Sequence, residues 1–372
     1  MKRIVFGLFC SVVTASFSQE SCCYDCPAVR EENVFSDVQG KLAAPRVGVC
    51  SVSLETDFLY WLPFEAGLEY AFTQDSDGLT PTGRSQDPSQ FATTENGQFQ
   101  RVNFDWGAGI RLKGGYRLPL DDWDLFLRWT RIHTHANDSV SINSLANQNI
   151  AAIWLEAEFV LLGYLRARSA EGKWNLSYNT LDLALGRSFY SSGHLMFTPN
   201  VGIRGFWINQ LFSANYSGGD LTLPAQFKGK NDFDGAGIFG ELGMKWQFLE
   251  RWSLVGDFLG SFNFGRLKVG QRVVSQIQSF PPEMIRRDVL QQKTHPLEFC
   301  YQGAIGVQWE KFFRSCYEKK VTLCILYELV EWLHINQLRR FFYSDFGSIT
   351  NYFPMDGNLG FQGISARLKV DF

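Results

Sequence analysis

The residues of this chain that could do chemistry are charged side chains that alternate with apolar ones. Over many short stretches, acidic and basic residues occupy one parity and apolar residues the other. If the apolar parity faces lipid, the other lines the lumen of a closed sheet, where charge sets the field that small solutes cross. The candidate pore-lining residues are Asp105, Arg111, Lys113, Arg117, Asp122, Asp124, Arg128, Asp182, Arg204, Glu241, Lys245, Asp257, Glu310, Arg367 and Lys369.

Two interpretations of these charges stay open. In the first they line a wet pore, and because both signs are nearly balanced the charge selectivity is not defined. In the second, many of them pair with partners on neighbouring strands and hold the wall together.

Groups that could support catalysis are sparse. A hydrolase needs a nucleophile with a nearby base, and only five histidines could supply that base: His133, His135, His194, His295 and His334. His133 and His135 share one face of a strand end, but no third metal ligand accompanies them. No glycine-rich phosphate loop lies between a strand and a helix. We therefore predict no enzyme, no metal and no cofactor.

The first residues have the pattern of an export signal. Lys2 and Arg3 precede an apolar run that ends in small residues, which predicts a secretory signal peptide at 1–18 and cleavage after Ser18. Residues 19–47 are polar and irregular and are interpreted as a periplasmic leader. Elsewhere no run reaches the roughly 18 apolar residues of a membrane-spanning helix, so an embedded form would be a barrel built from 48–372.

Export also permits disulfides. An odd number of cysteines remains after cleavage, so at least one is free or paired with another chain. Cys22, Cys23 and Cys26 are interpreted as cross-linking residues, because no further close pair of Cys or His residues follows them to complete a zinc site. The disulfide candidates are Cys22, Cys23, Cys26, Cys50, Cys300, Cys316 and Cys324, and their pairing stays open.

Alternation predicts a membrane barrel of about twelve antiparallel strands, within a range of 10–16. Several runs continue for about ten residues, as bilayer-crossing strands require. We expect tight turns at 119–121 and 249–251, and long polar loops near 73–98, 135–149, 215–231, 268–295 and 344–357. Eleven segments are clear, among them one from Ile153 to Leu161. The candidates for a missed strand are Asn209–Tyr216 and Gly67–Phe72.

The segment Glu318–Phe342 is ambiguous. It is rich in helix formers and could be an amphipathic helix. We predict a strand, because Val321, Leu323, Ile325 and Tyr327 alternate with polar residues.

The last stretch, Leu359–Phe372, has an apolar and a charged face and stops on an aromatic residue. It resembles the closing strand of bacterial outer-membrane barrels, in which the terminal aromatic residue is read by the barrel-insertion machinery. Phe372 is therefore the candidate assembly signal.

Six phrases, in order along the chain, resemble the chlamydial major outer membrane protein-like porins and the related pore-forming family described from Legionella. The resemblance implies a monomeric or trimeric barrel that passes small solutes, often in a cysteine cross-linked outer membrane. Glu318–Phe342 departs from this resemblance, because it is unusually rich in helix-forming residues for the family. The phrases lie at 54–71, 104–130, 174–187, 199–210, 233–248 and 357–372.

The sequence thus predicts a bacterial outer-membrane porin for passive diffusion of small hydrophilic solutes and ions. The alternative is a plugged barrel acting as a structural or adhesive surface protein. Expected partners are outer-membrane lipid, the barrel-assembly machinery, disulfide-linked envelope proteins and further copies in a homotrimer. A net charge of −3 without a basic stripe argues against nucleic acid.

Replacing Phe372 with a polar residue should impair assembly, because the terminal aromatic side chain is expected to mark the strand for insertion. The measurement is the amount of folded protein in isolated outer membranes. Normal membrane levels of the variant would count against the terminal signal.

Overall fold

The computed structural model describes residues 51–75, 97–118, 123–142, 148–155, 166–219, 221–277, 284–313, 319–344 and 349–372. By its internal contacts the chain divides into Met1–Asp37 and Val38–Phe372, and every described residue belongs to the second unit. The predicted signal peptide and leader lie outside the described residues and stay predictions. Among the described residues, no helix has the length and apolar character needed to cross a membrane.

All the regular structure that is described is strand. The strands are β1 (Ser51–Glu65), β2 (Glu69–Asp75), β3 (Gly97–Arg101), β4 (Gly107–Arg117), β5 (Trp123–Ser141), β6 (Gln148–Ala151), β7 (Arg166–Ala167), β8 (Ser169–Arg187), β9 (Phe189–Ser192), β10 (Leu195–Ser217), β11 (Leu221–Leu249), β12 (Trp252–Ile277), β13 (Met284–Thr294), β14 (Leu297–Phe313), β15 (Lys319–Asn336), β16 (Arg339–Ser344), β17 (Ile349–Pro354) and β18 (Gly357–Asp371).

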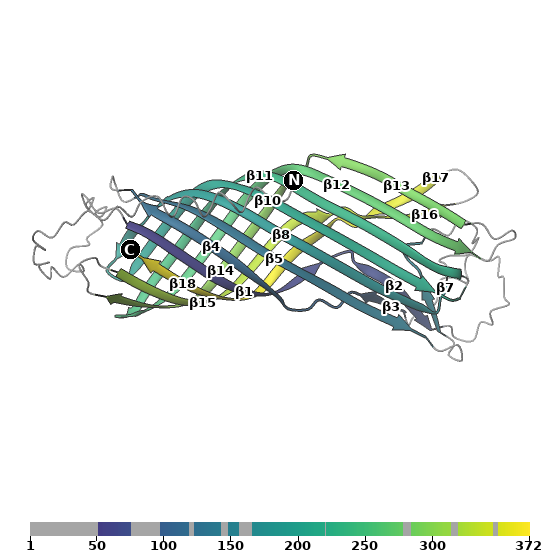
Figure 1. Cartoon of the computed structure of the whole chain (residues 1–372), viewed down its shortest axis with the longest axis horizontal. Coiled ribbons are helices and arrows are strands. Elements are labelled where there is room, and N and C mark those ends of the chain that lie inside the picture. The colour runs from purple at the N-terminus through teal and green to yellow at the C-terminus, as the bar shows by residue number, and fades with distance from the viewer. Residues whose placement is uncertain are drawn as a thin grey trace, which may run out of the picture. The chain divides into compact units, whose positions relative to one another are not determined.

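Ten of these strands close into a barrel (Figure 1). Each pairs antiparallel with two neighbours in the order β1, β4, β5, β8, β10, β11, β12, β14, β15, β18 and back to β1. The short strands β9 and β13 pair along parts of β10 and β12. The predicted closed antiparallel barrel is confirmed, and its strand number is at the lower end of the predicted range.

The number falls below twelve because neither candidate for a missed strand adds a member to the ring. Asn209–Tyr216 is the continuation of β10, and Gly67–Phe72 overlaps β2, which belongs to a separate sheet. The predicted strand from Ile153 is wrong where it is described, since residues 153–155 form a turn whose side chains are buried. The strand prediction for Glu318–Phe342 is confirmed by β15.

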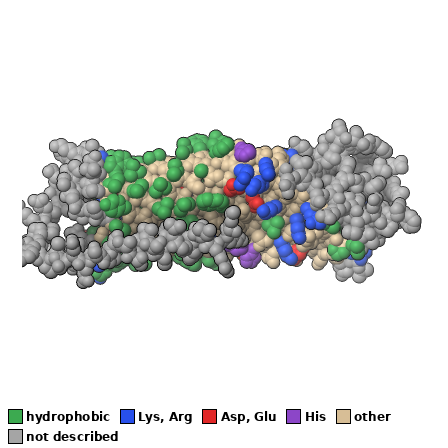
Figure 2. Space-filling model, turned by 45° about the horizontal axis from the view of Figure 1, so that its top comes forward, with side chains coloured by type: hydrophobic (Ala, Val, Ile, Leu, Met, Phe, Trp, Pro, Cys, Tyr) green, Lys and Arg blue, Asp and Glu red, His purple; other side chains and the backbone are tan. Residues whose placement is uncertain are grey.

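Side chains alternate between the two faces of the wall. Along β8 every second residue is buried, so Asp182 and Ala184 face inward while Leu181 and Leu183 are exposed on the outer face. Figure 2 shows apolar side chains gathered over one part of that outer face. Exposed apolar surface on this scale is unusual in a soluble protein but is what a lipid-facing band requires.

Several strands run far beyond this band. The lengths are 23 residues for β10, 29 for β11 and 26 for β12. The predicted loops at 215–231 and 268–295 are therefore wrong for most of their length, and those at 135–149 and 344–357 overlap β5 and β17. Outside the apolar band the outward residues become polar and inward ones such as Phe227, Leu267 and Val269 are apolar, so the parity of the alternation reverses before the strand ends. The predicted tight turn at 249–251 is confirmed between β11 and β12.

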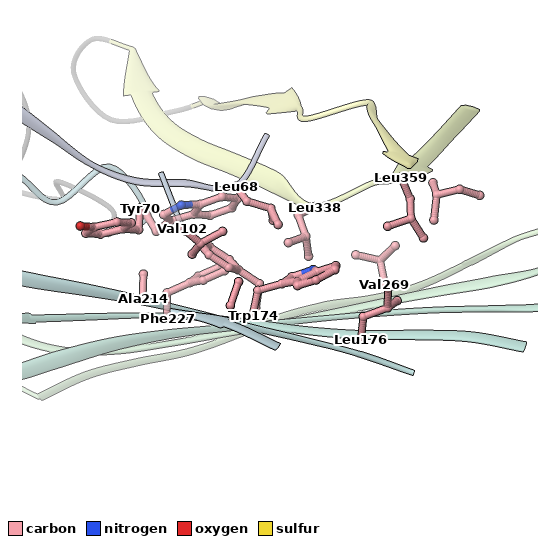
Figure 3. Close-up of a cluster of buried hydrophobic side chains, with 14 of the residues drawn as sticks. Leu68, Tyr70, Val102, Trp174, Leu176, Ala214, Phe227, Val269, Leu338 and Leu359 are labelled. Atoms are coloured by element: carbon pink, nitrogen blue, oxygen red, sulfur yellow. The ribbon is translucent and has the colours of Figure 1, made fainter. Parts of the chain in front are cut away.

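Beyond the ring, β2, β3, β6 and β7 form a sheet of their own, and β16 pairs with β17. Side chains of this region pack against inward residues of the long strands in one apolar core. Figure 3 shows Leu68, Leu338 and Leu359 on one side of it and Trp174, Leu176 and Phe227 on the other. Tyr70 of β2 donates a hydrogen bond to Asp138 at 2.9 Å. Burial and this carboxylate raise the pKa of Tyr70.

Gly306 of β14 lies at a closely packed position of the barrel wall. A Cβ atom at this position would lie 2.0 Å from the carbonyl oxygen of Ile325 on β15, whereas one at Gly240 would meet nothing within 4 Å. Gly306→Ala should therefore destabilise the barrel by roughly 1–3 kcal/mol through overpacking. The measurement is urea unfolding of protein refolded in lipid vesicles. Gly240→Ala is the matched control, and equal losses in both variants would contradict the argument.

Candidate functional site

The inside of the barrel brings together most of the predicted pore-lining residues. They come from eight of the ten ring strands, and alternation turns each of them inward. The inward-facing ones are Arg111, Lys113, Arg128, Asp182, Arg204, Glu241, Lys245, Asp257, Glu310, Arg367 and Lys369.

The remaining four predicted residues lie elsewhere. Asp105 is exposed in the irregular stretch ahead of β4, where no ladder continues the parity that the sequence predicts. Arg117 and Asp124 pair with each other at 2.9 Å near the end of the β4–β5 hairpin, and both are partly exposed. Asp122 lies outside the described residues.

A first group of ion pairs is centred on Asp57 of β1. Its carboxylate accepts hydrogen bonds from Arg111 at 3.0 Å and from Arg367 at 3.1 and 3.2 Å. Arg111 also makes a bidentate pair with Glu328 of β15 at 2.9 and 2.8 Å, a planar geometry that favours guanidinium over ammonium. Arg367 further pairs with Glu55 at 3.0 Å.

A second group is centred on Asp182 of β8. Arg204 donates to both its oxygens at 2.7 and 3.0 Å, and Arg128 donates to one of them at 2.9 Å. Arg128 then reaches Glu241 of β11 at 3.2 and 3.0 Å. Asp182 and Arg204 are each 1% exposed, and such deeply buried charges are tolerated only when they are paired and hydrogen-bonded.

Lysines dominate a third group. Lys245 and Lys320 lie 2.5 and 3.5 Å from the carboxylate of Glu310, and Lys320 also contacts Asp371 at 3.3 Å. Lys369 completes the group with a contact to Asp371 at 3.1 Å.

The sequence prediction omitted several members of these groups. They are Glu55, Asp57, Lys320, Glu328 and Asp371. The signal that could have found the carboxylates Glu55, Asp57 and Glu328 is the same parity rule, because each alternates with outward residues that are mostly apolar.

We call the Asp57 and Asp182 groups together the charge layer. Its members are Glu55, Asp57, Arg111, Arg128, Asp182, Arg204, Glu241, Glu328 and Arg367. A small pocket of about 30 Å³ is lined by Arg111, Arg128, Glu241, Glu328 and Arg367 of this layer, together with neighbouring residues that include Asp257 and Leu259.

A second set of inward side chains, which we call the aromatic layer, lies farther along the same strands. It consists of Trp61, Tyr178, Phe206, Phe233, Trp332 and Phe361, all buried. Trp61 and Trp332 follow Asp57 and Glu328 by four residues, and Tyr178 precedes Asp182 by four on an antiparallel strand. This spacing amounts to roughly 13 Å along each strand. Arg111 lies 5.4 Å from the centroid of the Trp61 ring and links the two layers.

Ring contacts connect the aromatic layer across the lumen. Trp332 of β15 lies 6.2 Å from Tyr178 of β8 and 5.2 Å from Phe206 of β10, measured between ring centroids. Phe361 of β18 lies 5.0 Å from Tyr178. Strands β8 and β15 are five positions apart in the ring of ten, so the first of these contacts crosses the full width of the barrel.

Two of the disulfide candidates, Cys300 and Cys324, are free thiols on the inner face. In the β14–β15 register, Cys300 lies opposite Trp332 and Cys324 opposite Gln308. This offset of eight residues amounts to roughly 26 Å, far beyond the reach of a disulfide. The two cannot pair with each other, and the other candidates lie outside the described residues.

Phe372, His133 and His135 lie outside the lumen. Phe372 is exposed, and its backbone exchanges two hydrogen bonds with Val52 where β18 meets β1. His133 and His135 are exposed on the outer face of β5. Within the described ranges, no group of three His, Cys, Asp or Glu residues is placed to hold a metal.

A closed antiparallel sheet with an apolar outer band and a charged interior defines a β-barrel of the outer-membrane class. Residues 51–372 match the sequence family described as Legionella pneumophila major outer membrane protein precursor. The chain belongs to this family of outer-membrane proteins. The family resemblance predicted from the sequence is thereby confirmed.

Solved structures give a distant likeness. The Escherichia coli outer membrane protease OmpT matches with 9% identity over 87% of this chain and 96% of that chain, at a TM-score of 0.38. A Pseudomonas aeruginosa FadL homologue matches with 9% identity over 87% and 90%, at 0.26. The P. putida toluene transporter TodX matches with 9% identity over 87% and 89%, at 0.25. The curated proteins contain no match.

Removing one member of the charge layer should destabilise the barrel. Arg204→Met leaves Asp182 buried with one partner fewer, and the expected loss in free energy of unfolding is about 3–5 kcal/mol. Urea unfolding in lipid vesicles measures it. Arg117→Met is the matched control, because its pair with Asp124 is partly exposed and worth about 0–1 kcal/mol. A loss at Arg204 no larger than at Arg117 would show that the charge layer does not hold the wall.

Proposed function

We propose that this protein is an outer-membrane barrel with a closed lumen that serves as a structural component of the cell surface. The observation that carries the proposal is the contact between Trp332 and Tyr178. Besides their ring contact, Trp332 Nε1 donates a hydrogen bond to the Tyr178 hydroxyl at 3.3 Å. Because these residues come from opposite strands, the pair bridges the barrel at a level where a hydrated solute would have to pass.

The number of strands supports the same proposal. Barrels of 16–18 strands leave an aqueous channel, whereas side chains can fill the smallest barrels. The ring has ten strands, and its described inward side chains meet in two successive layers. The general-diffusion porin predicted from the sequence would need both layers to open. The family's description as a major outer membrane protein is in keeping with an abundant envelope component.

Restricted passage of water and small ions is the second candidate function, and the charge layer favours it. Ionisable groups inside a membrane protein are expensive and often mark an ion path. Here Arg111 and Arg128 each hold carboxylates on two sides, so small rearrangements could exchange one partner for an ion or water. An opening of the aromatic layer would still be required.

Other expectations from the sequence stay predictions. They are the lack of enzymatic activity, the homotrimer, the disulfide-linked envelope partners, and export with cleavage after Ser18. Hydrolysis of lipid and peptide substrates by the purified protein would overturn the first. Cross-linking of intact cells and N-terminal sequencing of the mature protein address the others.

Single-channel recording in a planar bilayer tests the closed lumen. The refolded protein should give no large, reproducible conductance steps. The double variant Trp332→Ala and Tyr178→Ala should give steps larger than any that the unaltered protein shows. It removes the bridge across the lumen and leaves the charge layer, in which Arg111 and Arg128 can exchange one partner for an ion or water.

The matched control is Phe258→Ala with Phe262→Ala, which removes two aromatic side chains that face outward. Far-ultraviolet circular dichroism and the shift in gel mobility on heating show whether each variant is folded. Large steps from the unaltered protein would overturn the proposal and restore the open porin. A folded Trp332 and Tyr178 variant without added conductance would show that another element blocks the lumen.

A further inference from the structure

The outer face of β11 and β12 changes character sharply along the strands. On β12 the exposed side chains of Phe262 and Phe264 are followed, at every second position, by Arg266 and Lys268. Each outward step along a strand is roughly 7 Å. Cations therefore begin within one step of the last lipid-facing aromatic residue, on the part of β12 that leads away from the chain's C-terminal end. Figure 2 shows such a group of charges beside the apolar band.

We call the cationic group on β11, β12 and β13 the cation patch. Its residues are Lys228, Lys230, Arg266, Lys268, Arg272 and Lys293. Asp234 lies 3.0 Å from Arg266 and 3.9 Å from Lys268. Lys230 pairs with Asp232. Even with the carboxylates of Asp232 and Asp234 counted, positive charge is in excess among these residues.

Two pairs of like charges stand directly opposite each other in the patch. Lys268 of β12 is opposite Lys293 of β13, and Lys228 of β11 is opposite Arg272 of β12. Like charges at directly opposed positions of an antiparallel pair share one face and destabilise the sheet. An anion between Lys268 and Lys293 would turn this repulsion into two charge-assisted hydrogen bonds. The patch thus has an arrangement that an anionic ligand would stabilise.

A groove of about 620 Å³ borders the patch and shares Lys228 and Arg272 with it. Its polar wall includes a chain of hydrogen bonds. Gln226 donates to Asn215 at 2.7 Å, and Asn215 donates to Glu171 at 3.1 Å. The hydrogen bond from Lys173 lowers the pKa of Glu171, so this carboxyl is ionised at neutral pH. Amides and carboxylates of this kind are hydrogen-bonding partners for sugar hydroxyl groups.

We propose that the cation patch and this groove bind the phosphorylated sugar headgroup of a glycolipid in the outer leaflet of the membrane. The acyl chains would lie along the apolar band below Phe264, the phosphates between Lys268 and Lys293, and the sugar against the groove. A membrane lipid fits better than a soluble phosphate, because the apolar band and the cations follow each other on the same strands.

The test is thermal unfolding of the full-length refolded barrel in neutral detergent, with and without lipopolysaccharide that carries its lipid A phosphates. The variant is Lys268→Gln with Lys293→Gln. Without lipid it should be at least as stable as the unaltered protein, since the repulsion is relieved. With lipid the order should reverse, and the apparent affinity of the variant should be roughly ten-fold or more weaker.

Lys311→Gln with Lys319→Gln is the control of equal charge change, because these exposed lysines lie on β14 and β15 far from the patch. Dephosphorylated lipid A and inorganic phosphate are the probes that separate sources of the anion. Equal stabilisation of the patch variant and the control by lipopolysaccharide would overturn the proposal. So would equal binding of the dephosphorylated lipid, or full competition by millimolar inorganic phosphate.

Discussion

The structure depends on one constraint, that a backbone surrounded by lipid must satisfy its hydrogen bonds within the wall. The pairing of β1 with β18 satisfies this constraint, because it joins the first and last described strands of the chain. Their antiparallel register runs from Ser53 opposite Asp371 to Glu65 opposite Leu359. Closure removes both sheet edges. It also fixes the circumference at ten strands, and so sets how far apart opposite inner faces can be.

That distance explains what fills the interior. In a ring of this size a tryptophan from one strand meets a tyrosine from the opposite strand, as Trp332 and Tyr178 do. Arginine side chains likewise reach beyond their neighbours, since Arg111 of β4 contacts Glu328 of β15 across β1 and β18. Inward residues are therefore partners of one another and not only the lining of a passage. The charge and aromatic layers follow from ring size and inward side-chain length.

The sequence predicted the wall better than the interior. Alternation found the strands where one face is apolar, as in Leu181, Asp182 and Leu183, and it chose strand over helix for β15. It failed beyond the apolar band, where β11 and β12 continue with polar residues on their outer faces. Alternation also did not predict the number of strands in the ring, because Asn209–Tyr216 can be interpreted as a separate strand until its register with β8 is known. Whether inward charges meet across the lumen depends on that ring size.

The two interpretations of the inward charges are not exclusive. Arg111 binds Asp57 on the adjacent strand and Glu328 three strands away, and Arg128 binds Asp182 and Glu241 in the same manner. The aspartate contacts join neighbours in the wall, whereas the glutamate contacts cross the lumen. Losing the glutamate contacts alone would leave each arginine paired with its aspartate, but it would bury Glu328 and Glu241 without their arginine partners, which is destabilising. The aromatic layer shows the same division, because Trp61 contacts Phe361 on the adjacent strand whereas Trp332 contacts Tyr178 on the opposite one. Both layers thus combine contacts that hold neighbouring strands together with contacts that bridge the interior.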